Sequence, residues 1–178
     1  MAVKKMVQLV AVVASFAVAT AAQAQKAPVR DGFWFSGGLG AGSLGTQNGS
    51  SRETGLSGDI SLGGTLSPKW LIGVGSSAWS KSEQGGRLTV ATLDARVRFY
   101  PSATGGFFVT GGVGAGQIRA SVGGISATDN GAGAIFGLGY DYRIARNASI
   151  TPYWNGFAMK SDNNDANVGQ VGLAITLH

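Results

Sequence analysis

The feature that most restricts the fold of this chain is an alternation of apolar and polar residues with a period of two. It is clearest from Leu88 to Tyr100, where Asp94, Arg96 and Arg98 fall on one face and only uncharged residues fall on the other. Successive side chains of a β-strand point to opposite sides of a sheet, whereas the apolar positions of a helix recur every three or four residues. The pattern therefore predicts an all-β chain whose strands have two unlike faces.

Eight stretches with this alternation follow one another along the chain. They cover residues 32–44, 54–66, 69–80, 88–100, 107–119, 132–143, 149–158 and 168–177. Strands of about 10 residues are long enough to cross the hydrocarbon layer of a membrane when they are tilted. An even number of such strands is typical of a closed antiparallel barrel, which leaves no unpaired edge in lipid.

The connections between these stretches differ in length from one end of the predicted barrel to the other. Short turns alternate with longer polar loops, and the predicted loops are residues 45–53, 81–87, 120–131 and 159–167. This order favours an up-and-down meander whose two ends face different surroundings. Because 178 residues allow one domain, we predict a single eight-stranded transmembrane β-barrel over residues 32–178.

The N-terminal residues have the composition of an export signal. Lys4 and Lys5 precede an apolar stretch over residues 6–21, and the small-x-small sequence Ala22-Gln23-Ala24 follows it. This order predicts a secretory signal peptide over residues 1–24, because the apolar stretch is shorter than the roughly 20 residues of a spanning helix. Residues 25–31 would then form a short lead into the barrel.

The alternation alone does not say which face meets water, but the charged residues decide it. A basic side chain that faced lipid at mid-bilayer would cost roughly 2–4 kcal/mol, so the charged face should line the lumen. That face is also rich in glycine, and an eight-stranded barrel has an interior that side chains can fill. We therefore predict a plugged lumen that contains an ion-pair network of Asp59, Asp94, Arg96, Arg98 and Asp141.

The aromatic residues support the same orientation. Ten of them lie near the short turns or at the N-terminal entry, namely Phe33, Trp34, Phe35, Trp70, Phe99, Tyr100, Phe107, Phe108, Tyr140 and Tyr142. A soluble core would scatter such residues, whereas a membrane barrel collects them in a girdle at the interface. The sequence therefore predicts an aromatic girdle at the end with the short turns.

Several segments resemble a known family. The segments 111–115 (GGVGA), 137–144 (GLGYDYRI) and 151–155 (TPYWN) are similar to those of the outer-membrane beta-barrel domain proteins, the small bacterial barrels related to OmpX and to the OmpA membrane domain. The resemblance implies the outer membrane of a Gram-negative cell, short turns in the periplasm, loops outside, and insertion by the barrel assembly machinery. Family members usually end on an aromatic residue, whereas this chain ends on Leu177-His178.

The composition excludes several kinds of chemistry. The chain has no cysteine and one histidine, which removes thiol catalysis and multi-histidine metal sites. The glycines Gly40, Gly42 and Gly45 match a dinucleotide fingerprint, but they lie within a predicted strand that no helix follows. The acidic cluster at 162–165 misses the calcium-loop spacing and indicates a solvated turn. We therefore expect no cofactor and no metal site, and the scattered basic residues indicate no nucleic-acid partner.

These observations predict a monomeric, non-enzymatic outer-membrane protein with an envelope-structural or surface-interaction role through its loops. Its partners would be membrane lipid and lipopolysaccharide, whose phosphates attract cations near the loop ends. The candidate cations are Arg52, Lys81, Arg87, Arg119 and Lys160.

Two alternatives remain open. A lipid A-modifying barrel enzyme would need a serine and an acid beside a histidine, and the only histidine is His178. A soluble barrel of the lipocalin or avidin kind would instead bury the apolar face in its lumen.

Overall fold

A computed structural model describes residues 30–46, 52–83, 85–161 and 165–178, so the predicted signal peptide lies outside the described residues. The described part is built of β-strands. They are β1 (Phe33–Thr46), β2 (Glu53–Ser67), β3 (Trp70–Glu83), β4 (Gly86–Phe99), β5 (Phe107–Val122), β6 (Ile125–Tyr140), the two-residue β7 (Tyr142–Arg143), β8 (Ala148–Lys160) and β9 (Asp165–Leu177). Within these residues no helix has the length and apolar character that crossing a membrane requires.

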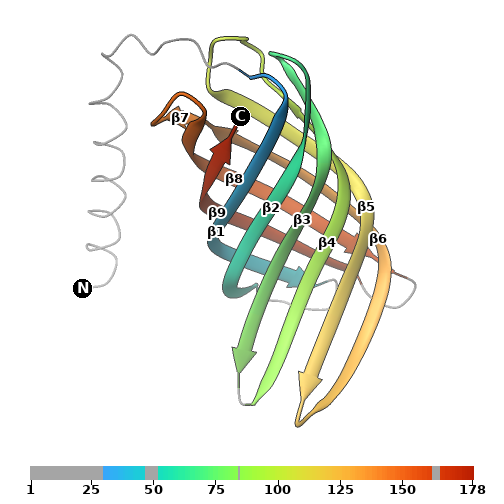
Figure 1. The fold of residues 1–178 in the computed structure, drawn as a ribbon. Helices are drawn as coiled ribbons and strands as arrows, with labels where there is room; N and C mark the ends of the chain where they lie inside the picture. The colour runs from blue at the N-terminus through green and yellow to red at the C-terminus, as the bar shows by residue number, and fades with distance from the viewer. Residues whose placement is uncertain (1–29, 47–51, 84, 162–164) are drawn as a thin grey trace, which may run out of the picture.

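The eight long strands close into a barrel (Figure 1). From β1 to β6, each strand pairs antiparallel with the next; β6 then pairs with β8, β8 with β9, and β9 with β1. The short β7 pairs only with the beginning of β8. The predicted eight-stranded, antiparallel, up-and-down barrel is therefore confirmed.

Two predicted loops are wrong, because strands continue through them. The sequence predicts a loop over residues 120–131, but β5 and β6 extend through this segment to a two-residue turn at Gly123 and Gly124. Both glycines have positive φ, at 58° and 86°, which a tight hairpin turn requires and most other residues avoid. The segment 81–87 likewise consists mainly of the ends of β3 and β4. As a result the β3–β4 and β5–β6 hairpins project beyond the other strands, at the foot of Figure 1.

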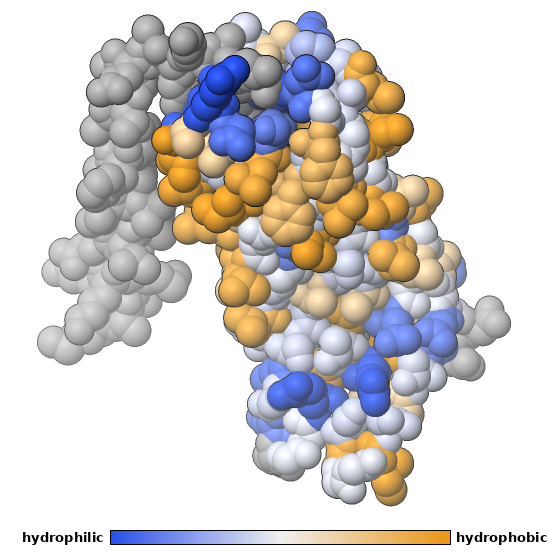
Figure 2. All heavy atoms as spheres, in the orientation of Figure 1, coloured by the Kyte–Doolittle hydropathy of each residue, from blue (hydrophilic) through white to orange (hydrophobic). Residues whose placement is uncertain are grey.

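The predicted orientation of the two faces is confirmed in the half of the barrel near the short turns. On β4, Leu93 is 64% exposed and Val97 also faces outward, whereas Arg96 between them is 2% exposed. Figure 2 shows a broad apolar surface over this half of the molecule. The outward side chains are therefore positioned to contact acyl chains, and the charges face a closed interior.

The two faces exchange their character toward the projecting hairpins. On the outside of β4 and β5 the apolar residues give way to Arg87, Thr89, Gln117 and Arg119. On the inside an apolar cluster appears, formed by Leu44, Trp79, Val90, Ile135, Phe157, Ala166 and Val168. A sheet that leaves the membrane meets water on its outer face, so its apolar residues must turn inward. The exchange is what we expect of a barrel that passes from lipid into water at this height.

The aromatic girdle is only partly as predicted. Phe33, Trp70 and Phe107 lie outward and exposed, as a girdle requires. However, Trp34, Tyr100 and Phe108 point into the lumen, where they are buried with Leu71. These three residues lie at the predicted end of the barrel. However, the alternation of side chains along each strand places them on its inner face instead of its outer surface.

Candidate functional site

The centre of the lumen contains a compact ion-pair cluster around Arg96. Its Nη1 lies 2.7 Å from Oδ2 of Asp59, and its Nε and Nη2 donate to the two carboxylate oxygens of Asp94 at 2.8 and 2.9 Å. Ser77 on β3 donates to Asp59 at 2.7 Å. Gly75 leaves the space that this guanidinium occupies, because a Cβ there would lie 2.3 Å from Cζ of Arg96. The cluster is thus a fully buried guanidinium paired with two carboxylates.

Arg98 does not join this cluster. Its guanidinium lies over the rings of Trp34 and Phe108, 4.8 and 4.1 Å from the ring centroids. Among the described residues no ion pair joins Arg98 to Asp141, the partner that the predicted network would give it. The structure therefore places all five predicted residues in the lumen or at its short-turn end but divides them, with Arg96, Asp59 and Asp94 in one group and Arg98 and Asp141 outside it.

Asp141 is the centre of a second polar cluster at the short-turn end. It accepts hydrogen bonds from the hydroxyls of Tyr100 and Thr151, both at 2.7 Å, and Nε2 of His178 lies 3.3 Å away. The Thr151 hydroxyl also lies 2.9 Å from that of Thr176. These contacts join β6, β8, β9 and the end of β4 into one plug.

Arg30, which precedes β1, closes this end of the barrel from outside the strands. Its guanidinium lies 3.5 Å from the centroid of the Tyr100 ring. It donates to the carbonyl oxygens of Pro68 and Ala103, at 3.2 and 3.1 Å, and of Gly105. Arg30 belongs to the short lead predicted for residues 25–31, and no pattern in the sequence distinguishes it.

The groups of this plug that lie outside the strands have shifted pKa values. Burial lowers the pKa of Arg30 and raises that of the Tyr100 hydroxyl, which therefore stays protonated and can donate. Burial alone would raise the pKa of Asp141, but the hydrogen bond from His178, the charge of Arg98 and the hydroxyl donors together hold it below its usual value. Asp141 is therefore an anion that accepts hydrogen bonds from the hydroxyls of Tyr100 and Thr151.

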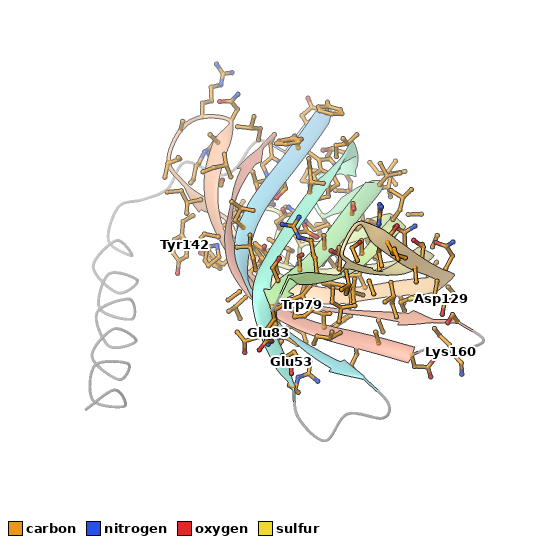
Figure 3. The ribbon with its side chains drawn as sticks, turned by 90° about the horizontal axis from the view of Figure 1, so that it is seen from below. Glu53, Trp79, Glu83, Asp129, Tyr142 and Lys160 are labelled. Carbon is orange, nitrogen blue, oxygen red and sulfur yellow. The ribbon has the colours of Figure 1, made fainter. Side chains whose placement is uncertain are left out.

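The five candidate cations divide by the face on which they lie. Lys81 lies opposite Leu88 on the inner face of the rim and forms ion pairs with Glu53 and Glu83. Figure 3 shows these two glutamates close together beside Trp79. The ammonium of Lys81 is therefore already neutralised by two carboxylates.

The other four cations lie on the outer face, above the apolar surface. Arg52 donates to Ser43 Oγ at 2.9 Å and to Asn167 Oδ1 at 2.8 Å. Lys160 lies opposite Asp165 where β8 and β9 end.

Arg87 and Arg119 share one groove on the outer face of the projecting sheet. Thr89 lies opposite Arg119 in the β4–β5 register, and Arg87 lies opposite Ser121, so the two arginines are diagonal neighbours. Arg87 donates a hydrogen bond to Ser82 at 3.1 Å, and Arg119 donates one to Ser126 at 3.4 Å. The groove has a volume of about 830 Å³. Besides the two arginines it is lined by glycines, by hydroxyl-bearing residues, by Ala91, Gln117 and Val122, and by Glu83, whose carboxylate forms an ion pair with Lys81. It can therefore accept an anionic, hydroxyl-rich group.

The chain forms a closed barrel with an apolar outer surface and a polar plug. These features are typical of the small β-barrels of outer membranes. The chain belongs to the outer membrane protein beta-barrel domain family, whose model matches residues 9–178. No curated protein sequence matches the chain significantly.

Solved structures show the same fold at low sequence identity. Neisserial surface protein A (NspA) superposes with a TM-score of 0.62 at 14% identity, over 82% of this chain and 96% of that one. Ail, the attachment invasion locus protein of Yersinia pestis, superposes with a TM-score of 0.57 at 15% identity, over 83% and 99%. A second structure of Ail, in complex with the heparin analogue sucrose octasulfate, gives a TM-score of 0.56 at 14% identity, over 83% and 99%.

Proposed function

We propose that this protein is a non-enzymatic barrel of the outer membrane that holds the β3–β6 sheet outside the cell, where Arg87 and Arg119 bind anionic saccharides. The observation that carries the proposal is the groove in which these two cations share the outer face of β4 and β5. Guanidinium groups bind phosphate by charge-assisted hydrogen bonds. The phosphorylated sugars of lipopolysaccharide would surround this height of the barrel.

The lumen supports a role at the surface rather than in transport. The Arg96 cluster and the Asp141 plug occupy successive levels of the interior. The cavity between Arg96, Arg98 and Tyr153 has a volume of about 10 Å³, roughly that of one water molecule. No solute larger than water would pass through a lumen filled in this way.

The surroundings of His178 support a non-enzymatic protein. A serine-type mechanism needs a hydroxyl that donates to the imidazole. In the described part of the chain the nearby hydroxyl of Thr151 donates to Asp141 instead, and Nδ1 of His178 has no partner.

Lipid A extracted from cells with and without the protein should therefore have the same mass spectrum, and a new lipid A species would support the enzyme.

A structural neighbour offers an analogy for the ligand. Ail has been solved with sucrose octasulfate, a densely anionic sugar analogue. The likeness to Ail is one of fold alone. We therefore use it only as an analogy for an anionic saccharide as the ligand.

We expect the double variant Arg87→Gln/Arg119→Gln to bind phosphorylated lipopolysaccharide core oligosaccharide at least about tenfold more weakly than the wild type, since hydrogen bonds to charged groups contribute roughly 1.5–3 kcal/mol each. Isothermal titration calorimetry on protein in nanodiscs at low ionic strength measures this affinity. The matched control is Arg146→Gln, which removes an exposed arginine at the opposite end of the barrel. Equal affinity of the double variant and the wild type would refute the proposed contact.

A further inference from the structure

Arg52 is held at the edge of the apolar outer surface, just before β2 begins. Its Nε donates to Ser43 Oγ at 2.9 Å, its Nη1 donates to Asn167 Oδ1 at 2.8 Å, and its Nη2 donates to the Ser43 carbonyl oxygen. Among the described residues none of these partners is a carboxylate, because the adjacent Glu53 turns to the inner rim and pairs with Lys81. The guanidinium is therefore fixed by neutral acceptors, and two of its five N–H groups stay available to a ligand.

A groove of about 430 Å³ lies beside this guanidinium, on the outer face of β1, β2 and β9, and Trp154 of β8 also lines it. Gly156 of β8 lies opposite Gly169 of β9, and neither has a side chain that would fill the space between the strands. The ring of Trp154 covers the first glycine, since a Cβ at residue 156 would lie 3.4 Å from Cη2 of that ring. Nη2 of Arg52 lies 4.0 Å from the position of a Cβ at residue 169. The Arg52 slot is thus a pair of glycines with a cation over one and an indole over the other.

The neighbouring side chains place the Arg52 slot at the boundary between lipid and water. Val171 and Trp154 form one outward row across β9 and β8, and Leu39 and Leu173 form the next row toward the short turns. All four side chains are exposed on the outer surface. On the other side of the slot the polar Asn167 follows. A tryptophan is enriched at such a boundary, because its ring is apolar and its N–H requires a polar partner.

The groove beside Lys160 does not have the same character. It is lined mainly by small apolar residues of β6 and β8, but Asp165 lies directly opposite Lys160 and also lines it. A phosphate in that groove would meet a carboxylate as well as the ammonium. The guanidinium of Arg52 has no such neighbour, and its planar fork matches the oxygens of a phosphate.

We propose that the Arg52 slot binds the phosphorylated sugar head of a glycolipid of the outer leaflet. The two available N–H groups of Arg52 would donate to a phosphate, and the apolar face of a sugar ring would pack against Trp154. The acyl chains would then lie over Val171 and Leu39. A phospholipid head would supply the phosphate but would leave the indole without a ring to cover it. The inference shares with the proposed function only the orientation of the barrel, because it concerns another site and the lipid part of the glycolipid.

Native mass spectrometry of the full-length protein in detergent, titrated with bis-phosphorylated lipid A that has no core sugars, measures this binding. We expect Arg52→Gln to weaken the affinity by about tenfold or more, because it removes a charge-assisted contact to phosphate. Gly169→Leu should weaken binding to a similar degree, because its side chain fills the slot while Arg52 remains. Lys160→Gln is the matched control, and it should change the affinity by less than about twofold, since an exposed charge outside the site contributes little.

The outcomes decide between a defined site and general attraction. Unboiled gel mobility shows that each variant is folded. Equal losses for Arg52→Gln and Lys160→Gln, or a folded Gly169→Leu protein that binds like the wild type, would overturn the site. Phosphatidylglycerol that binds as tightly as lipid A would overturn the assignment to a glycolipid. Core oligosaccharide has no acyl chains and this lipid A has no core sugars, so failure of the Arg87→Gln/Arg119→Gln prediction would overturn the proposed function alone, and failure of the Arg52→Gln prediction would overturn this inference alone.

Discussion

Replacement of Arg96 by leucine should lower the free energy of unfolding by roughly 3–5 kcal/mol, the largest effect that we expect from a single lumen substitution. The side chains of Arg96, Asp59 and Asp94 are almost completely buried, and the cation is held between the two carboxylates. Its removal would leave two like charges unpaired in an interior that water does not fill. Denaturant titration of the protein in detergent, followed by the gel shift between folded and unfolded forms, measures the change.

A matched variant distinguishes a lost cation from a lost side chain. The triple variant Asp59→Asn/Asp94→Asn/Arg96→Leu removes the same guanidinium together with both negative charges. Because replacement of a whole buried ion-pair group is often nearly neutral, the triple variant should recover most of the stability. An Arg96→Leu protein as stable as the wild type would show that the cluster is not buried as described.

The second large effect should come from a charge placed on the lipid-facing surface. Ala95 lies outward on β4 between the exposed residues Leu93 and Val97. Arginine at a mid-bilayer position of a barrel costs roughly 2–4 kcal/mol, whereas the cost near the interface is about 0–1 kcal/mol. Ala95→Arg should therefore reduce stability strongly in lipid vesicles, as measured by denaturant unfolding.

Thr89→Arg supplies the control for this variant. Thr89 lies on the same face of the same strand, where the outer surface is already polar and Arg119 lies opposite. The two arginines would be neighbours in water, so we expect only a small decrease in the free energy of unfolding. Similar losses at residues 89 and 95 would contradict the boundary between lipid and water that we assign to β4.

The order of the strands and the character of their faces could be predicted from the sequence, because both follow from the period of two. The extent of β5 and β6 could not be predicted in the same way. Residues 120–131 are mostly small and polar, as in a loop, but in the structure they continue the alternation, with Ala120, Val122, Ile125 and Ala127 inward and polar residues outward, until Asp129 interrupts it on the inner face. A reversal of the faces is the signal that would have identified a sheet leaving the membrane.

The candidate site was predictable in composition but not in its pairing. Register indicated that Asp94, Arg96 and Arg98 share the inner face, but which carboxylate meets which guanidinium depends on the tilt and stagger of the closed barrel. Arg98 contacts the rings of Trp34 and Phe108, which were assigned to the membrane interface. Arg30 could not have been found, because its partners are backbone carbonyls of distant turns.

The odd-numbered side chains of β4 should contact lipid from Leu93 to Val97 and water at Arg87 and Thr89. Nitroxide labels on single cysteines at residues 87, 89, 93 and 97, in protein reconstituted into bilayers, test it directly. We predict that residues 93 and 97 are accessible to oxygen dissolved in the bilayer, whereas 87 and 89 are accessible to a water-soluble nickel complex. Labels at 93 and 97 that are shielded from oxygen, or that collide freely with the nickel complex, would show that this face of β4 does not contact lipid.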